Sequence, residues 1–243
     1  MDIRKNTPLN GVVYGLALLG TILGGSLGMQ WLVYLCKPLL MLVLSSWFYF
    51  HSRRVGDRFT LLVQAGLFFS WIGDIALMFQ HVDQFNFLIG LAAFLIAQLC
   101  YTMAFAHNVA DVPGGPFPWP SIVLSVLIAA YGYFFAGRIV PSVDDGIMIP
   151  IIVYAIAISL MGIAAAFRFG RTFPRSFFAV VAGAFLFIAS DSLLAFNRFV
   201  RPLDGAEWMV MLTYGLAQIL IAGGCLAHVL DREEIRRRAA LTT

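Results

Sequence analysis

The stretch Leu61–Phe79, LLVQAGLFFSWIGDIALMF, is an apolar run with a single acidic residue, Asp74. At about 1.5 Å per residue, a helix of this length crosses a hydrocarbon core about 30 Å thick. A carboxylate inside such a span costs roughly 2.5–3.5 kcal/mol on insertion scales, so a buried acid there is a candidate for function. The stretch therefore predicts a membrane helix that carries a functional acid.

A second stretch, Phe177–Phe196 (FFAVVAGAFLFIASDSLLAF), resembles the first and carries Asp191. At the offset that superposes the two aspartates, the identical residues within the fifteen-residue window Ala65–Phe79 are Ala65, Gly66, Phe68, Asp74, Leu77 and Phe79. Two shorter matches share a nearby offset: Ala97-Gln98 with Ala217-Gln218, and Val33-Tyr34 with Val153-Tyr154. Because matched segments are four spans apart and run in the same direction, the pattern predicts a parallel internal repeat of two four-helix halves, about 11–110 and 119–230.

The composition indicates an integral membrane protein. Of 243 residues, 60% are hydrophobic and 12% are charged, whereas about 25% are charged in a soluble domain. The alternating segments of about 10 residues that are typical of an outer-membrane barrel are absent. We therefore predict an all-α, polytopic bundle of about eight transmembrane helices, forming a single domain over 1–243. The expected spans are about 11–29, 31–50, 60–79, 84–106, 119–140, 147–168, 176–197 and 208–230.

Basic residues predict the orientation of these spans. One side of the membrane would hold Arg4, Lys5, Arg53, Arg54, Arg58, Arg168, Arg171, Arg175, Arg232, Arg236, Arg237 and Arg238. The other side would hold Arg138, Arg198 and Arg201. This asymmetry places both termini in the cytoplasm, and a bacterial inner membrane is the expected location. We expect the first run to be a retained helix and not a cleaved signal peptide.

With this orientation, most of the polar residues inside spans fall in one layer. Asp74, Asp191 and Lys37 lie about 8–9 Å below the outer end of their spans, counted at about 1.5 Å per residue. Tyr154 and Tyr214 lie at about 9–10 Å by the same count, and Gln218 lies somewhat deeper. Structural polar groups scattered along a bundle would not be expected to align in this way.

Each of these groups also has a purely structural interpretation. The aspartates could form hydrogen bonds or ion pairs between helices, and Lys37 could simply neutralise one of them. Ser70 and Ser190 could bond their own backbone. Gln98 and Gln218 need interhelical partners in any case, and Asn197 could be an ordinary cap. The catalytic candidates are Asp74 and Asp191; the supporting candidates are Lys37, Ser190, Tyr154, Tyr214, Gln98, Gln218 and Asn197.

Several strings resemble those of the YhhN-type lysoplasmalogenase family. They are KPL (Lys37–Leu39), GDIAL (Gly73–Leu77), FLIGLAAFLIAQLCY (Phe87–Tyr101), GAFLFIASDSLLAF (Gly183–Phe196) and YGLAQ (Tyr214–Gln218). The resemblance implies a membrane hydrolase that cleaves the sn-1 vinyl ether bond of lysoplasmalogen, a lysophospholipid, to a fatty aldehyde and a glycerophospho-ethanolamine or -choline. It implies no cofactor. The chain departs from the family at Gln98, where histidine is expected, so a histidine cannot transfer a proton there.

The paired aspartates suit that chemistry. Vinyl ether hydrolysis requires one carboxylic acid to protonate carbon and one carboxylate to stabilise the resulting cation and activate water, a division of labour also found in glycoside hydrolysis. The alternative is a proton-coupled transporter or lipid flippase, since parallel repeats and intramembrane carboxylates are typical of both. An intramembrane aspartyl protease is disfavoured because Trp71-Ile72-Gly73-Asp74 departs from Gly-x-Gly-Asp. A purely structural scaffold is the remaining interpretation.

Other classes of function find little support in the sequence. Two aspartates without histidine make a poor zinc site, and His51, His81, His107 and His228 all fall at loops or span ends. We therefore predict no metal. The net charge of +3 comes from residues at helix ends and does not indicate a nucleic-acid partner. The expected partners are a lysophospholipid substrate and the surrounding membrane lipids.

Overall fold

The computed structural model describes the backbone of residues 5–111 and 117–241, and the side chains of that part as far as residue 232. The described residues form an all-helical bundle. Its α-helices are α1 (Thr7–Ser26), α2 (Gln30–Ser52), α3 (Arg58–Met78), α4 (Phe85–Ala110), α5 (Trp119–Ile139), α6 (Asp145–Ala166), α7 (Pro174–Phe199) and α8 (Ala206–Leu241). A short 3-10 helix, η2 (Val140–Ser142), follows α5. Each of the eight α-helices includes a segment long and apolar enough to cross a membrane, which confirms the predicted polytopic bundle.

The helix ends follow from local chemistry. The narrow break expected between the first two spans is confirmed, and Gly28 (φ 67°) makes it possible because this left-handed conformation is readily adopted only by glycine. The Met29 N–H then donates to Gly24 O at 2.7 Å, closing the end of α1 in the manner of a Schellman motif. The last span, expected to end at about residue 230, is confirmed by the apolar segment Ala206–Arg232, and the helix itself extends further. α8 continues to Leu241 because the residues that follow are good helix formers although they are charged.

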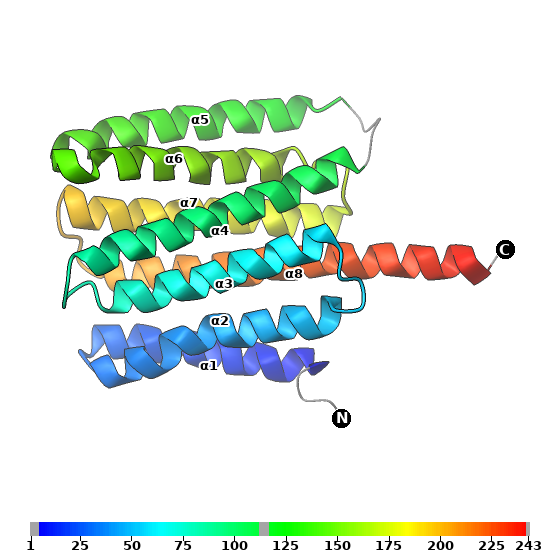
Figure 1. Ribbon diagram of the computed structural model, residues 1–243, viewed down its shortest axis with the longest axis horizontal. Coiled ribbons are helices and arrows are strands. Elements are labelled where there is room, and N and C mark those ends of the chain that lie inside the picture. Colours follow the sequence, from blue (N-terminus) through cyan, green and yellow to red (C-terminus); the bar gives the residue numbers. More distant parts are fainter. Residues whose placement is uncertain (1–4, 112–116, 242–243) are drawn as a thin grey trace.

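The helices form three groups across the bundle (Figure 1). α1 and α2 pack together on one side, and α5 and α6 on the other. Between them lie α3, α4, α7 and α8, with α3 packed along α4 and α7 along α8. The spans in α8, α4 and α3 are the most buried, and the span at α5 is the least buried. The central group therefore supplies most of the core, and both aspartate-bearing helices, α3 and α7, belong to it.

Successive α-helices run in opposite directions along the bundle (Figure 1). One end holds the connections α1–α2, α3–α4, α5–α6 and α7–α8, and we call it the connection end. At the opposite end, the terminal end, α1 begins and α8 finishes. Asp74 and Asp191 are each less than three turns from the connection end of their helices. The parallel repeat and the cytoplasmic orientation stay predictions, and Arg4 and the side chains of Arg236, Arg237 and Arg238 lie outside the described residues.

Arg168 departs from the sequence-based expectation. It was counted among the basic residues that flank spans at the membrane surface, but the side chain is 0% exposed. Its guanidinium donates to Asn108 Oδ1 at 3.0 Å and to Ser176 Oγ at 2.8 Å, and it lies 5.3 Å from the centre of the Phe105 ring. Burial lowers the pKa of Arg168 to about 10. This residue therefore ties the α6–α7 connection to α4 inside the bundle.

Candidate active site

A cavity of about 550 Å³ lies among the connection-end halves of α1, α2, α3, α7 and α8. This volume is within the range of small-molecule binding sites. We call it the polar cavity. Its charged and polar lining residues are Thr21, Gln30, Tyr34, Lys37, Asp74, Gln80, His81, Ser190, Asp191, Asn197, Glu207 and Tyr214. Asp74 and Asp191, which are far apart in the chain, therefore line the same cavity.

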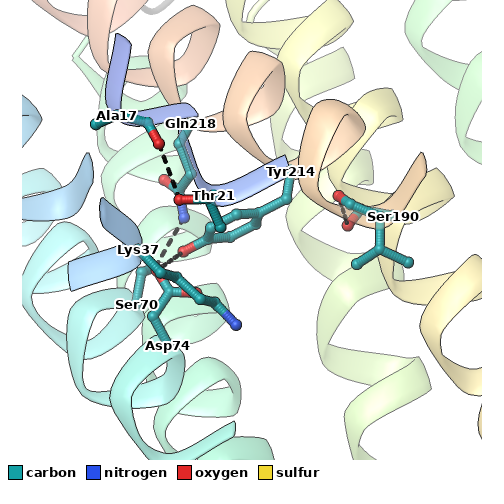
Figure 2. A network of polar contacts seen from close by, with 9 residues as sticks. Ala17, Thr21, Lys37, Ser70, Asp74, Ser190, Tyr214 and Gln218 are labelled. Carbon is teal, nitrogen blue, oxygen red and sulfur yellow. Dashed lines mark hydrogen bonds and ion pairs between the residues drawn. The ribbon is translucent and has the colours of Figure 1, made fainter. Parts of the chain in front are cut away.

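Asp74 is held by partners from two other helices (Figure 2). The Tyr214 hydroxyl of α8 donates to Asp74 Oδ2 at 2.8 Å, and Lys37 Nζ of α2 lies 3.8 Å from Oδ1. Asp74 is 1% exposed, whereas the Lys37 side chain is 13% exposed and reaches the cavity. Gly73 allows this arrangement because a Cβ there would lie only 2.6 Å from the ring of Phe94. A buried acid is thus paired with an ammonium and oriented by a hydroxyl.

A second set of hydrogen bonds supports this pair one helical turn deeper. Tyr214 and Gln218 are four residues apart on α8, as Ser70 and Asp74 are on α3, so each pair shares a helix face. The Gln218 amide nitrogen donates to Ser70 Oγ at 2.9 Å, and its Oε1 accepts from the Tyr101 hydroxyl at 2.9 Å. All of these side chains are buried. Gln218 therefore lies behind the cavity and holds α3, α4 and α8 in register.

Asp191 has a different environment. Its Oδ2 accepts a hydrogen bond from the Tyr154 hydroxyl of α6. Among the described side chains no basic group forms an ion pair with it. Asp191 also lines a second, smaller cavity of about 90 Å³ among α4, α5, α6 and α7. We call this the apolar cavity, because its walls are mostly aliphatic and aromatic, including Ile128, Phe135 and Ile158. Asp191 therefore lies at the boundary between a polar and an apolar space.

Two of the other predicted supporting residues, Ser190 and Asn197, line the polar cavity, and a third, Gln98, does not. Ser190 and Asn197 also make structural bonds. Ser190 Oγ donates to Val210 O at 3.1 Å, linking α7 to α8, and Asn197 Oδ1 accepts from the Leu203 N–H at 2.8 Å. Neither contact is the one expected from the sequence, because Ser190 bonds the backbone of a neighbouring helix and not its own, and Asn197 holds an N–H of the α7–α8 connection and does not cap a helix. Both residues nevertheless belong to the cavity lining.

Gln98 lies away from the polar cavity. Its side chain is 0% exposed, and neither amide atom forms a hydrogen bond with the described residues. The amide lies near the hydroxyl of Tyr154 without meeting hydrogen-bond geometry. The matched residues Gln98 and Gln218 therefore have different surroundings, since Gln218 has two side-chain partners.

Sequence reasoning missed several polar residues of the lining, including four near helix ends, Gln30, Gln80, His81 and Glu207. All four lie within a few residues of a helix end, where polar residues are common and carry no signal of their own. His81 had been set apart from the aspartates because it follows the third span, but the α3–α4 connection lies over the cavity. The Tyr34 hydroxyl and His81 Nε2 lie 3.4 Å apart. These residues can be recognised as part of the site only in the tertiary structure, where the ends of five helices come together.

The arrangement favours acid–base chemistry on a bound organic molecule. Within the described residues there is no cluster of three or more histidine, cysteine or acidic side chains that could hold a metal ion. The polar cavity instead offers two carboxylates with unlike partners, one with an ammonium and a hydroxyl and the other with a hydroxyl alone. Such a difference between two carboxyl groups is typical of sites where one acts as acid and the other as base.

The chain is similar to several known proteins. The chain is 30% identical over 187 residues to Lysoplasmalogenase TMEM86B from Sus scrofa, covering 77% of this chain and 71% of that protein. It is 30% identical over 173 residues to Lysoplasmalogenase TMEM86A from Homo sapiens (70% and 66% covered), and 32% identical over 146 residues to Lysoplasmalogenase from Mycobacterium bovis (57% and 50% covered). No solved structure matches the chain. The sequence model of the YhhN family matches residues 32–225, so the chain belongs to the YhhN family.

Proposed function

We propose that this protein hydrolyses the vinyl ether bond of lysoplasmalogens within the membrane, using Asp74 and Asp191 as an acid–base pair. The observation that carries the proposal is that both carboxylates line one cavity of about 550 Å³ in a bundle of apolar helices. The names of the relatives support a lysophospholipid as the substrate. The unlike partners of the two acids support unlike roles.

The two cavities suggest how the substrate lies. The polar cavity reaches the connection end and suits the glycerophosphate headgroup. The apolar cavity suits the first methylene groups of the alkenyl chain, with the rest of the chain passing between helices into lipid. Asp191, Leu77, Phe94 and Leu194 line both cavities. In this pose the vinyl ether, which joins chain to headgroup, lies beside Asp191.

The proposed reaction consumes one water molecule. Asp191, at the edge of the apolar cavity, donates its proton to the β-carbon of the vinyl ether, which leaves an oxocarbenium cation. Asp74, held ionised beside Lys37, stabilises the cation and takes a proton from the attacking water, giving a hemiacetal. The hemiacetal hydroxyl then returns a proton to Asp191, while Asp74 protonates the departing glycerol oxygen. The products are the aldehyde and the glycerophospholipid headgroup, and both acids return to their starting states.

The test uses purified protein in detergent with an alkenyl lysophospholipid. We expect aldehyde release without any ion gradient, and in heavy water one deuterium at the carbon next to the aldehyde. Asp74→Asn and Asp191→Asn should abolish turnover while the protein stays folded. Asp144→Asn, an exposed aspartate at the start of α6, is the matched control and should retain activity. Full turnover in both cavity variants would remove the aspartate mechanism.

The transporter or flippase alternative predicts other results. It predicts no aldehyde from the detergent-solubilised protein and movement of labelled lysolipid only in sealed vesicles. Asp74→Asn and Asp191→Asn would then block movement and leave no hydrolysis to measure. Assaying the same preparation in both formats separates the two functions.

We infer that the polar cavity opens toward the outer face of the membrane. The basic residues of the α2–α3 and α6–α7 connections, such as Arg54 and Arg171, lie at the terminal end, opposite the cavity. Positive loops favour the cytoplasm, so both termini would be cytoplasmic in a bacterial inner membrane. A lysolipid would then reach the site from the outer leaflet.

A further inference from the structure

The mouth of the polar cavity carries a carboxylate that the proposed hydrolysis does not use. Glu207 lies in the first turn of α8 and lines the cavity. It leans over α1, because a Cβ on Gly25 would lie 3.0 Å from Glu207 Oε2. An acid in the first turn of a helix is favourable in itself. The preference for an acid in the first turn does not explain why this carboxylate lines a cavity large enough for a ligand. The other acids in the described lining of that cavity are Asp74 and Asp191.

The rise of α8 between two residues that line the cavity matches the length of a phospholipid headgroup. Glu207 precedes Tyr214, the partner of Asp74, by two helical turns, which is about 10.5 Å at 1.5 Å per residue. In a glycerophosphoethanolamine, nine bonds separate the sn-1 oxygen from the nitrogen, and an extended chain of that length spans about 10–11 Å at the reach per bond of a peptide. With the sn-1 oxygen near Asp74, the nitrogen therefore reaches Glu207.

The distribution of charge also fits a zwitterion. The lining includes Lys37, His81, Gln30, Gln80 and Asn197, which offer N–H donors for a phosphate. A headgroup that ended in phosphate alone would place further negative charge toward the carboxylate of Glu207. A headgroup with a terminal ammonium places its positive charge there instead, and complementary charge of this kind sets specificity more than affinity.

We propose that Glu207 recognises the ammonium group of an ethanolamine or choline headgroup. The placement of the glycerol backbone rests on the proposed function. Ethanolamine carries three N–H donors, whereas the trimethylammonium of choline carries none. The carboxylate therefore discriminates most strongly between ethanolamine and an uncharged headgroup such as glycerol, and choline lies between them.

The test measures binding of lysolipids that the proposed reaction does not cleave. The probes are saturated 1-O-alkyl lysophospholipids with ethanolamine, choline or glycerol headgroups, and affinity is measured by calorimetry on the full chain in detergent. We expect Glu207→Gln to weaken binding of the ethanolamine probe about fivefold to tenfold, a modest factor because Glu207 is exposed to solvent. Binding of the glycerol probe should stay the same or improve.

Two further variants provide a second test of the proposal and a control. Gly25→Val places a side chain of α1 against the Glu207 carboxylate and should reduce the affinity for the ethanolamine probe, as Glu207→Gln does. The proposal can therefore still be tested if Glu207→Gln does not fold. Asp204→Asn removes an exposed acid of the α7–α8 connection outside the cavity lining, and it should bind all probes as the wild type does.

Equal losses for all three headgroups in Glu207→Gln, or an equal loss of ethanolamine affinity in Asp204→Asn, would overturn the assignment. A wild type that binds the ethanolamine and glycerol probes with equal affinity would overturn it as well. Aldehyde release from the alkenyl substrate is measured separately. Headgroup discrimination that depends on Glu207, in a protein that releases no aldehyde, would support the recognition site and reject the hydrolase.

Discussion

Replacing Tyr214 by phenylalanine removes one hydroxyl and leaves the rest of the site intact. The ring is packed edge-on against Phe94 and Phe187, with centroids 5.7 and 5.6 Å away, so phenylalanine keeps the same packing. The lost contact is the 2.8 Å bond to Asp74 Oδ2. A hydrogen bond to a charged group contributes about 1.5–3 kcal/mol, which is about tenfold to a hundredfold in rate if it acts in the transition state. We expect kcat to fall by that factor and KM to change less.

Tyr101→Phe is the matched control for this variant. The Tyr101 hydroxyl donates to Gln218 Oε1 at 2.9 Å, and both side chains are 0% exposed. Its loss leaves a buried acceptor unpaired, which costs about 1–3 kcal/mol of stability. This bond does not touch Asp74, so Tyr101→Phe should lower the melting temperature with little change in kcat.

The assay follows aldehyde release from an alkenyl lysophospholipid by its reduction with alcohol dehydrogenase and NADH, in detergent at saturating and limiting substrate. Thermal unfolding of both variants is recorded in the same detergent. Equal losses of kcat in Tyr101→Phe and Tyr214→Phe would refute the reasoning, because the effect would then follow stability and not the orientation of Asp74. Unchanged kcat in Tyr214→Phe would do the same.

Three further predictions test other parts of the structure. Lys37→Met removes the ammonium 3.8 Å from Asp74 and should lower kcat about tenfold or more, with choline and ethanolamine substrates affected alike. Gly183→Ala places a Cβ 2.9 Å from a backbone oxygen of α8 and should cost about 1–3 kcal/mol in thermal unfolding, whereas Gly137→Ala meets open space and should be neutral or slightly stabilising. In intact cells, a membrane-impermeant thiol reagent should label Asp204→Cys and not Arg54→Cys; the reverse pattern would invert the proposed orientation.

Much of the fold was predictable because a membrane constrains a chain so strongly. A span needs about twenty apolar residues and satisfies its backbone internally, so the number of helices and most of their ends follow from hydropathy. The candidate acids were also predictable, since Asp74 and Asp191 stand out against an apolar background. Glu207 was not predictable in this way. It lies among other polar residues near the α7–α8 connection, so its charge does not distinguish it from its neighbours in the sequence.

Within the candidate site, pairing was harder to predict than position. Depth along each span placed Lys37 and Tyr214 in the aspartate layer, and both do contact Asp74. Depth alone could not say that Lys37 would pair with Asp74 and Tyr154 with Asp191, because that choice depends on which helices are neighbours. It also failed for Arg168, a residue at a span end that turns inward.

Hydropathy and charge along the chain were enough to predict that it crosses a membrane as a helical bundle and that two acids lie within its spans. These properties are local, since each depends on the residues of one segment and on their contrast with hydrocarbon. The tertiary structure alone decided that the two carboxylates line one cavity, that their partners differ, and that an apolar cavity adjoins Asp191. Those properties depend on the packing of helices far apart in the chain, which no single segment encodes.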